Sequence, residues 1–116
     1  MATVAFVSDD NHGGTWTGIV TGDTVTQTRI TRNGFYNLTV SGTFAGGTVA
    51  KLLVGPTTGP TKSLPTDNTG AGTEWSTTAV TGTFVIGPLA AGTYIKPSVA
   101  SGSADNVTFT LAYAGE

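Results

Sequence analysis

Residues 40–54 read VSGTFAGGTVAKLLV, and this stretch decides the fold class of the chain. Branched and apolar residues flank the central Gly-Gly pair, which adopts positive φ without a Cβ clash, so the pattern predicts strand, turn and strand. A loop of residues 45–47 pairs Val40 with Leu52 and turns Lys51 outward, whereas a two-residue loop would put the lysine on the apolar face. We therefore predict a β-hairpin with a bulged three-residue turn.

A second hairpin is predicted just before it, over residues 24–41. The turn signal is Asn-Gly inside residues 32–34, and a three-residue loop there pairs Ile30 with Tyr36. This register keeps the apolar side chains of both strands on one face.

Other short apolar runs between turn residues predict further strands. Pro97 lacks a ladder donor, which predicts that its strand lies at an edge or a bulge. Residues 107–113 alternate apolar and small residues most regularly and predict a core strand with one buried face. The remaining strands are predicted at residues 15–20, 74–80, 83–86 and 92–99.

Composition favours an all-β domain. The chain of 116 residues contains 24 threonines and 17 glycines, whereas charged residues make up 10%. Threonine suits a pleated, half-buried surface and glycine suits turns. The prediction is an antiparallel β-sandwich or a small jelly-roll-like barrel of seven to nine short strands, with one β domain at residues 9–116.

Two segments stand apart from this domain. Residues 1–8 are either a first strand or an N-terminal arm that becomes ordered on a partner. Residues 55–72 contain three of the five prolines, which predicts a long loop that either binds a partner or is mobile.

Charge and cysteine usage exclude several function classes. The formal net charge is −2, from residues scattered singly along the sequence, so we expect no stripe of cations and neither nucleic acid nor a membrane as partner. Cysteine is absent, which excludes disulfides and thiolate metal sites. The first residues carry no basic region and no long apolar run, so we expect no signal peptide and no membrane span.

The chain offers little for catalysis. His12 is the single histidine, and its acidic neighbours lack the ligand spacing of a calcium loop, so we interpret them as a solvated turn. Dispersed carboxylates give no acid/base pair, and no catalytic triad can be assembled. We predict no catalytic residues, no metal, no cofactor and no enzymatic activity.

Several of these elements together resemble the small head decoration proteins, or capsid cement proteins, of tailed bacteriophages. The resemblance covers residues 36–113. It is carried by a strand, Gly-Gly-Thr and strand unit at residues 41–54, then Trp75, then the Ala-Gly-Thr-Tyr element at residues 91–94, and finally a Val-x-Phe-x-Leu strand at residues 107–111.

The resemblance implies a β-sandwich that forms a homotrimer on the outside of the capsid and bridges capsomers of the major capsid protein. It implies a virion protein, made in the host cytoplasm, that needs no cofactor. We expect the contact to come from residues 1–8 or from the loop at residues 55–72. The candidate partner-binding residues are Val4, Phe6, Trp16, Pro60, Leu64 and Trp75.

Two other function classes remain open. A carbohydrate- or receptor-binding β-module would place Trp16 or Trp75 on an exposed concave face, whereas core packing is the alternative role of each tryptophan. A structural subunit of a tail or fibre would present a long exposed apolar face.

Overall fold

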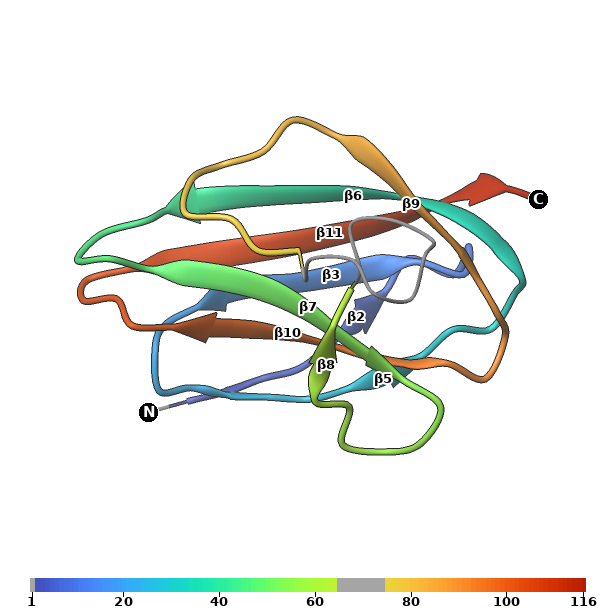
Figure 1. The fold of residues 1–116 in the computed structure, drawn as a ribbon, viewed down its shortest axis with the longest axis horizontal. Helices are drawn as coiled ribbons and strands as arrows, with labels where there is room; N and C mark the ends of the chain where they lie inside the picture. The colour runs from blue at the N-terminus through green and yellow to red at the C-terminus, as the bar shows by residue number, and fades with distance from the viewer. Residues whose placement is uncertain (1, 65–74) are drawn as a thin grey trace.

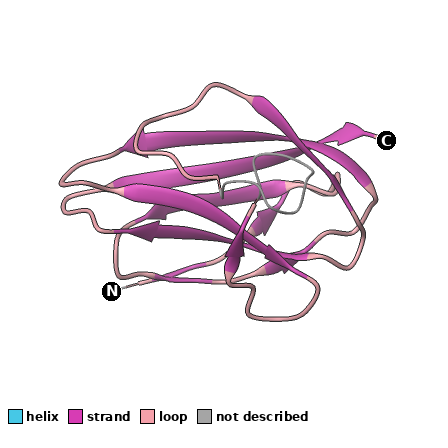
Figure 2. Cartoon of the chain, in the orientation of Figure 1, coloured by secondary structure: helices cyan, strands magenta, loops and turns pink. Residues whose placement is uncertain are grey.

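Two β-sheets stacked face to face form the body of the protein (Figure 1). The computed structural model describes residues 2–64 and 75–116, and these residues contain eleven strands and no helix (Figure 2). The all-β prediction is confirmed, and the strand number exceeds the predicted seven to nine because five strands have two residues each. The strands are β1 (Thr3–Val4), β2 (Val7–Ser8), β3 (Gly14–Ile19), β4 (Thr24–Val25), β5 (Thr28–Arg29), β6 (Gly34–Thr43), β7 (Val49–Gly55), β8 (Lys62–Ser63), β9 (Phe84–Leu89), β10 (Tyr94–Ala100) and β11 (Asn106–Gly115).

The larger sheet has the strand order β2-β3-β11-β6-β9 and is antiparallel throughout. Its central strand β11 turns Val107, Phe109 and Leu111 into the core, which confirms the predicted period of two. Phe109 lies opposite Val40 on β6. The best-patterned strand of the sequence therefore occupies the middle of the sheet.

The smaller sheet has the order β5-β10-β7-β8. Pro97 on β10 lies opposite Leu52 on β7, and the Leu52 carbonyl accepts a hydrogen bond from Leu64 N–H on its other side, at 2.8 Å. The imide nitrogen of Pro97 therefore points away from β7, and β5 pairs with β10 only at Tyr94 and Ile95. Strand β10 therefore has a neighbour on each side, against the prediction of an edge strand, but the sheet is open locally at Pro97 because β5 ends before it.

The core lies between the two sheets and includes three large aromatic side chains, Trp16, Tyr36 and Phe109, all fully buried. Tyr36 and Phe109 come from β6 and β11, and Trp16 comes from β3. The Trp16 indole Nε1 donates to the Thr26 carbonyl at 2.8 Å, so its single polar atom is satisfied inside the core.

Both predicted hairpins are wrong. Strand β6 belongs to the larger sheet and β7 to the smaller one, so Val40 and Leu52 enter the core from opposite sheets instead of pairing. Ile30 exchanges backbone hydrogen bonds with Gly92 and Thr93, at 2.8 Å each, and does not pair with Tyr36. Alternation fixes which side chains face the core, but it is the same for two paired strands and for two strands in facing sheets.

The strand predicted at residues 74–80 is also wrong for residues 75–80, since residue 74 lies outside the described residues. This segment makes one isolated bridge, between Thr77 and Ala50 of β7. Further along, Thr81 N–H donates to the Val40 carbonyl at 2.9 Å. The segment therefore passes from one sheet to the other.

A buried carboxylate holds the connections at one end of the sandwich. Asp105 Oδ2 accepts from Thr21 Oγ1 at 2.6 Å and lies 3.0 Å from Thr48 Oγ1, while Oδ1 accepts from the Thr21 N–H at 3.0 Å. Burial acts to raise the pKa of Asp105, but the hydrogen bonds from Thr21 and Thr48 outweigh it and hold the pKa below its usual value. Two of the connections between the sheets, β6 to β7 and β10 to β11, meet at this carboxylate.

Asp105→Asn is expected to lower the free energy of unfolding at pH 7 by about 1–2 kcal/mol, because hydrogen bonds to a charged acceptor are lost. Since the folded-state pKa lies below the ordinary value of 3.8, the carboxylate stabilises the fold above that pH. Its contribution disappears as the pH falls through the folded-state pKa. Urea unfolding of both proteins between pH 7 and pH 3 tests this, and a difference independent of pH would contradict it.

Gly102→Ala is expected to destabilise the fold by about 1–3 kcal/mol. A Cβ at this position would overlap Thr48 Oγ1 and Asp105 Oδ2 and press on the Ala45 carbonyl. Gly82→Ala is the control, because a Cβ there meets nothing within 4 Å. Thermal unfolding measures both, and equal stability of the two variants would refute the role of this packing.

Candidate functional site

The six residues predicted to bind a partner are all buried or partly buried, and five of them belong to the core or pack against it. Three of them, Trp16, Pro60 and Leu64, are buried, with Trp16 at 0% exposure. The other three, Val4, Phe6 and Trp75, are partly buried against the core cluster. None is an exposed anchor in this chain as folded.

The N-terminal segment is part of the domain. Strand β1 pairs in parallel with β4, and β2 pairs antiparallel with β3. The Phe6 ring lies 4.6 Å from the Trp16 ring, centroid to centroid, at an interplanar angle of 55°. Of the two alternatives for residues 1–8, the described residues therefore form strands.

Trp75 covers the side of the sandwich next to β8 and β9. The centroid of its ring lies 5.7 Å from that of the Phe84 ring, and its backbone N–H donates to the Leu64 carbonyl at 2.7 Å. The carbohydrate-binding alternative expects an exposed tryptophan on a concave face. Trp16 is buried and Trp75 is half-buried, so neither presents such a platform. The predicted loop at residues 55–72 lies outside the described residues from residue 65 on, and in its described part Lys62 and Ser63 form strand β8, so the prediction of an uninterrupted loop is wrong there.

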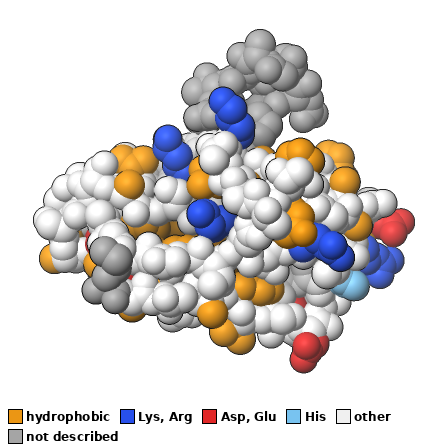
Figure 3. Space-filling view, turned by 90° about the horizontal axis from the view of Figure 1, so that it is seen from below, with side chains coloured by type: hydrophobic (Ala, Val, Ile, Leu, Met, Phe, Trp, Pro, Cys, Tyr) orange, Lys and Arg blue, Asp and Glu red, His pale blue; other side chains and the backbone are white. Residues whose placement is uncertain are grey.

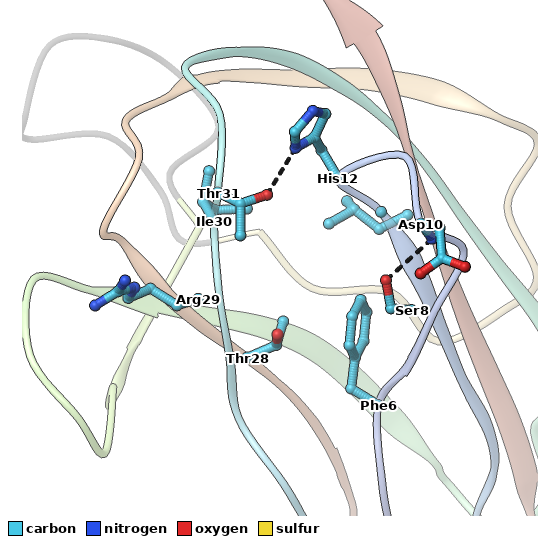
Figure 4. Close-up of a pocket in the computed structure, with 10 residues that line it drawn as sticks. Phe6, Ser8, Asp10, His12, Thr28, Arg29, Ile30 and Thr31 are labelled. Atoms are coloured by element: carbon cyan, nitrogen blue, oxygen red, sulfur yellow. Dashed lines mark hydrogen bonds between the residues drawn. The ribbon is translucent and has the colours of Figure 1, made fainter.

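A groove of about 480 Å³ opens between the segment that follows β1 and the segment at residues 28–31 (Figure 4). Apolar side chains line part of it, and Figure 4 places the Arg29 guanidinium pointing away from Phe6 and Ser8. Charged groups therefore do not converge on one point in the groove. It is lined by Phe6, Ser8, Asp10, His12, Gly13, Thr28, Arg29, Ile30, Thr31 and Leu111.

The turn at the rim of this groove is held by its own hydrogen bonds. Asp10 and His12 have φ of 64° and 65°, a left-handed conformation that is strained for residues other than glycine. Asp9 Oδ1 accepts from the N–H groups of Asn11 at 2.7 Å and Gly13 at 3.2 Å, which offsets the strain. His12 Nδ1 lies 2.9 Å from Thr31 Oγ1. In the described part of the chain, no three His, Asp or Glu side chains gather as a metal site.

The outer face of the smaller sheet collects cations. Ile95, Pro97 and Leu52 point into the core, so Lys96 on β10 and Lys51 on β7 point outward. Lys51 pairs with Ser98, two residues from Lys96, which makes the two lysines diagonal neighbours. Arg29 on β5 pairs with Tyr94, again two residues from Lys96. We call this surface the cationic face, and it is made of Arg29, Lys51, Leu53, Tyr94, Lys96 and Ser98.

The strands of the larger sheet contribute no charged side chain to its outer face. None of its five strands contains an Asp, Glu, Lys or Arg. Hydroxyls form a row across it, since Thr110 pairs with both Thr15 and Thr39, and Thr39 Oγ1 lies 2.8 Å from Thr83 Oγ1. Val85 is 61% exposed on this face. We call it the uncharged face, and it is made of Val7, Thr15, Asn37, Thr39, Ser41, Thr83, Val85, Thr108, Thr110 and Ala112.

The expectation that the cations form no stripe is wrong for the smaller sheet. Its four strands carry one cation each, Arg29, Lys51, Lys62 and Lys96, and no acidic residue. The side view of Figure 3 has Lys and Arg side chains spread over its upper half and right side. The signal in the sequence is a lone cation inside each of these strands. The strand order brings Arg29, Lys51 and Lys96 together on the outer face, whereas Lys62 pairs with Val54, which packs against the core.

The class of protein that these features define is an all-β sandwich with two chemically distinct outer faces. No protein-family model, no curated protein and no solved structure matches this chain. Within residues 2–64 and 75–116, no helix is long and apolar enough to cross a membrane.

Phe6→Ala is expected to lower the free energy of unfolding by about 2 kcal/mol, because the half-buried ring packs on Trp16. Val7→Ala is the control, since Val7 is 68% exposed, and it is expected to change stability by less than about 0.5 kcal/mol. Chemical denaturation measures both. A Phe6→Ala protein as stable as the parent would restore the interpretation of residues 1–8 as a loose arm.

Proposed function

We propose that this chain is a non-enzymatic structural protein of a phage virion. It binds the outside of the capsid as a homotrimer and stabilises the shell by bridging neighbouring capsomers of the major capsid protein. The resemblance of residues 36–113 to phage head decoration proteins supports this proposal. It gains further support from the two broad outer faces of the sandwich, since binding of this kind needs surfaces and no reaction centre.

The uncharged face is the observation that carries the proposal. Interface cores are depleted in charged residues, because a buried ion must lose its water or find a partner. A sheet face of threonine, serine, alanine and valine side chains is buried without that penalty. We assign this face to the contacts between copies of the chain in the trimer.

Trimerisation strengthens binding to the shell. Three linked copies engage neighbouring sites together, so the second and third contacts form at high effective concentration. A protein that binds the assembled shell and not the free subunits stabilises the shell by mass action. This accounts for a stabilising effect without any chemical step.

Val85→Glu is expected to convert the trimer into single chains and to lower capsid occupancy at least about tenfold, because a carboxylate is placed in the proposed contact. Val80→Glu is the control, because Val80 is 58% exposed and lies outside the uncharged face. Light scattering gives the mass of each protein, and sedimentation with purified undecorated capsids gives the occupancy.

Two results would contradict the proposal. One is a parent chain that leaves undecorated capsids bare at micromolar concentration. The other is a Val85→Glu protein with unchanged mass and occupancy, which would remove the uncharged face from the assembly.

A further inference from the structure

The distribution of charge over the molecule is strongly uneven. The four strands of the smaller sheet carry four of the five cations and none of the seven acidic residues. The remainder of the chain, with one cation and seven carboxylates, has a formal charge of −6. The protein is therefore acidic overall but presents one positive surface.

In the described residues, no cation of this surface forms an ion pair with an acidic side chain. The ion pair there joins Arg32 to Glu116 at 3.4 Å, and it involves no residue of the smaller sheet. Like charges on one sheet face destabilise a sheet. An acidic partner relieves this repulsion when it binds.

We propose that the cationic face docks on a carboxylate-rich surface of a partner protein. This inference deepens the proposed function, because it names the chemistry of the shell surface that the trimer covers. Lys51 and Lys96 are half-buried, so their alkyl stems lie along the sheet beside Leu53 and Tyr94. The result is a broad surface that combines apolar area with positive charge, which matches the pairing of an apolar core with a polar rim in protein interfaces.

Local carboxylates fit this face better than a long polyanion does. Three cations on one face match a small acidic patch. A nucleic acid or an anionic bilayer extends beyond the face and meets the remainder of the chain, whose charge of −6 repels it. The charge pattern therefore selects a compact acidic surface and rejects extended phosphate polymers.

The first experiment uses the full chain and three probes: a hexaglutamate peptide, a thymidine hexanucleotide and phosphatidylserine vesicles. Binding to hexaglutamate is expected to be the tightest and to weaken as salt is added. Lys51→Gln with Lys96→Gln is expected to weaken it at least about fivefold, mainly through the association rate. Arg32→Gln is the control, because Arg32 lies outside the cationic face and is expected to change binding less than twofold.

Tighter binding to the hexanucleotide or to the vesicles overturns the inference in favour of a phosphate partner. Absence of binding to hexaglutamate overturns it as well, and so does equal loss in the Arg32→Gln control. Thermal unfolding of each variant confirms that it is folded. Glutamine replaces each lysine because it is polar, uncharged and of similar length.

The second experiment separates this inference from the proposed function. Undecorated capsids are mixed with the parent and with the Lys51→Gln, Lys96→Gln protein, and lower occupancy by the variant supports both proposals. Equal occupancy by the two proteins overturns the cationic face as the docking surface but leaves the decoration function standing. Binding to hexaglutamate without binding to capsids supports the cationic face and contradicts the decoration function.

Discussion

The buried Asp105 carboxylate is the interaction on which the arrangement of the two sheets depends. Two of the connections that join the sheets, β6 to β7 and β10 to β11, meet at this side chain. The carboxylate accepts hydrogen bonds from the hydroxyls of Thr21 and Thr48, and these bonds join three connections that are far apart in the sequence. With the passages fixed at one end, the inner faces of both sheets close over one core, and the outer faces take their positions from it.

Sequence patterns predicted which side chains face inward far better than which strands pair. Val107, Phe109 and Leu111 are buried as their alternation indicates, and the sheet is open locally at Pro97. Val40 and Leu52 are also buried, yet they belong to different sheets. A period of two reports the face of a strand and carries no information on its neighbour. The contact between Thr48 and Asp105 spans 57 residues, and nothing in either local sequence announces it.

The candidate site was harder to predict than the fold, for a related reason. An aromatic residue beside a turn has the same local sequence whether it anchors a partner or fills a core, so Phe6 and Trp16 gave the same signal as exposed residues would. For the cations, in contrast, the local sequence gave no signal of clustering although the fold brings them together. Arg29, Lys51 and Lys96 are isolated in the sequence and become neighbours only through the strand order β5-β10-β7. Burial and charge clustering are both set by tertiary pairing.

The abundance of threonine links the fold to the proposed role. A threonine has the β-branched side chain that favours a strand and a hydroxyl that is tolerated in water, so the same residue builds the larger sheet and finishes its outer face. A sheet made in this way is stable without charged residues on its surface, which leaves that surface free to be buried in an assembly. Four of the five cations are then found in the strands of the smaller sheet, so the two sheets differ in charge. In the proposed assembly, one neutral and one positive face would orient each molecule between its own copies and an acidic surface.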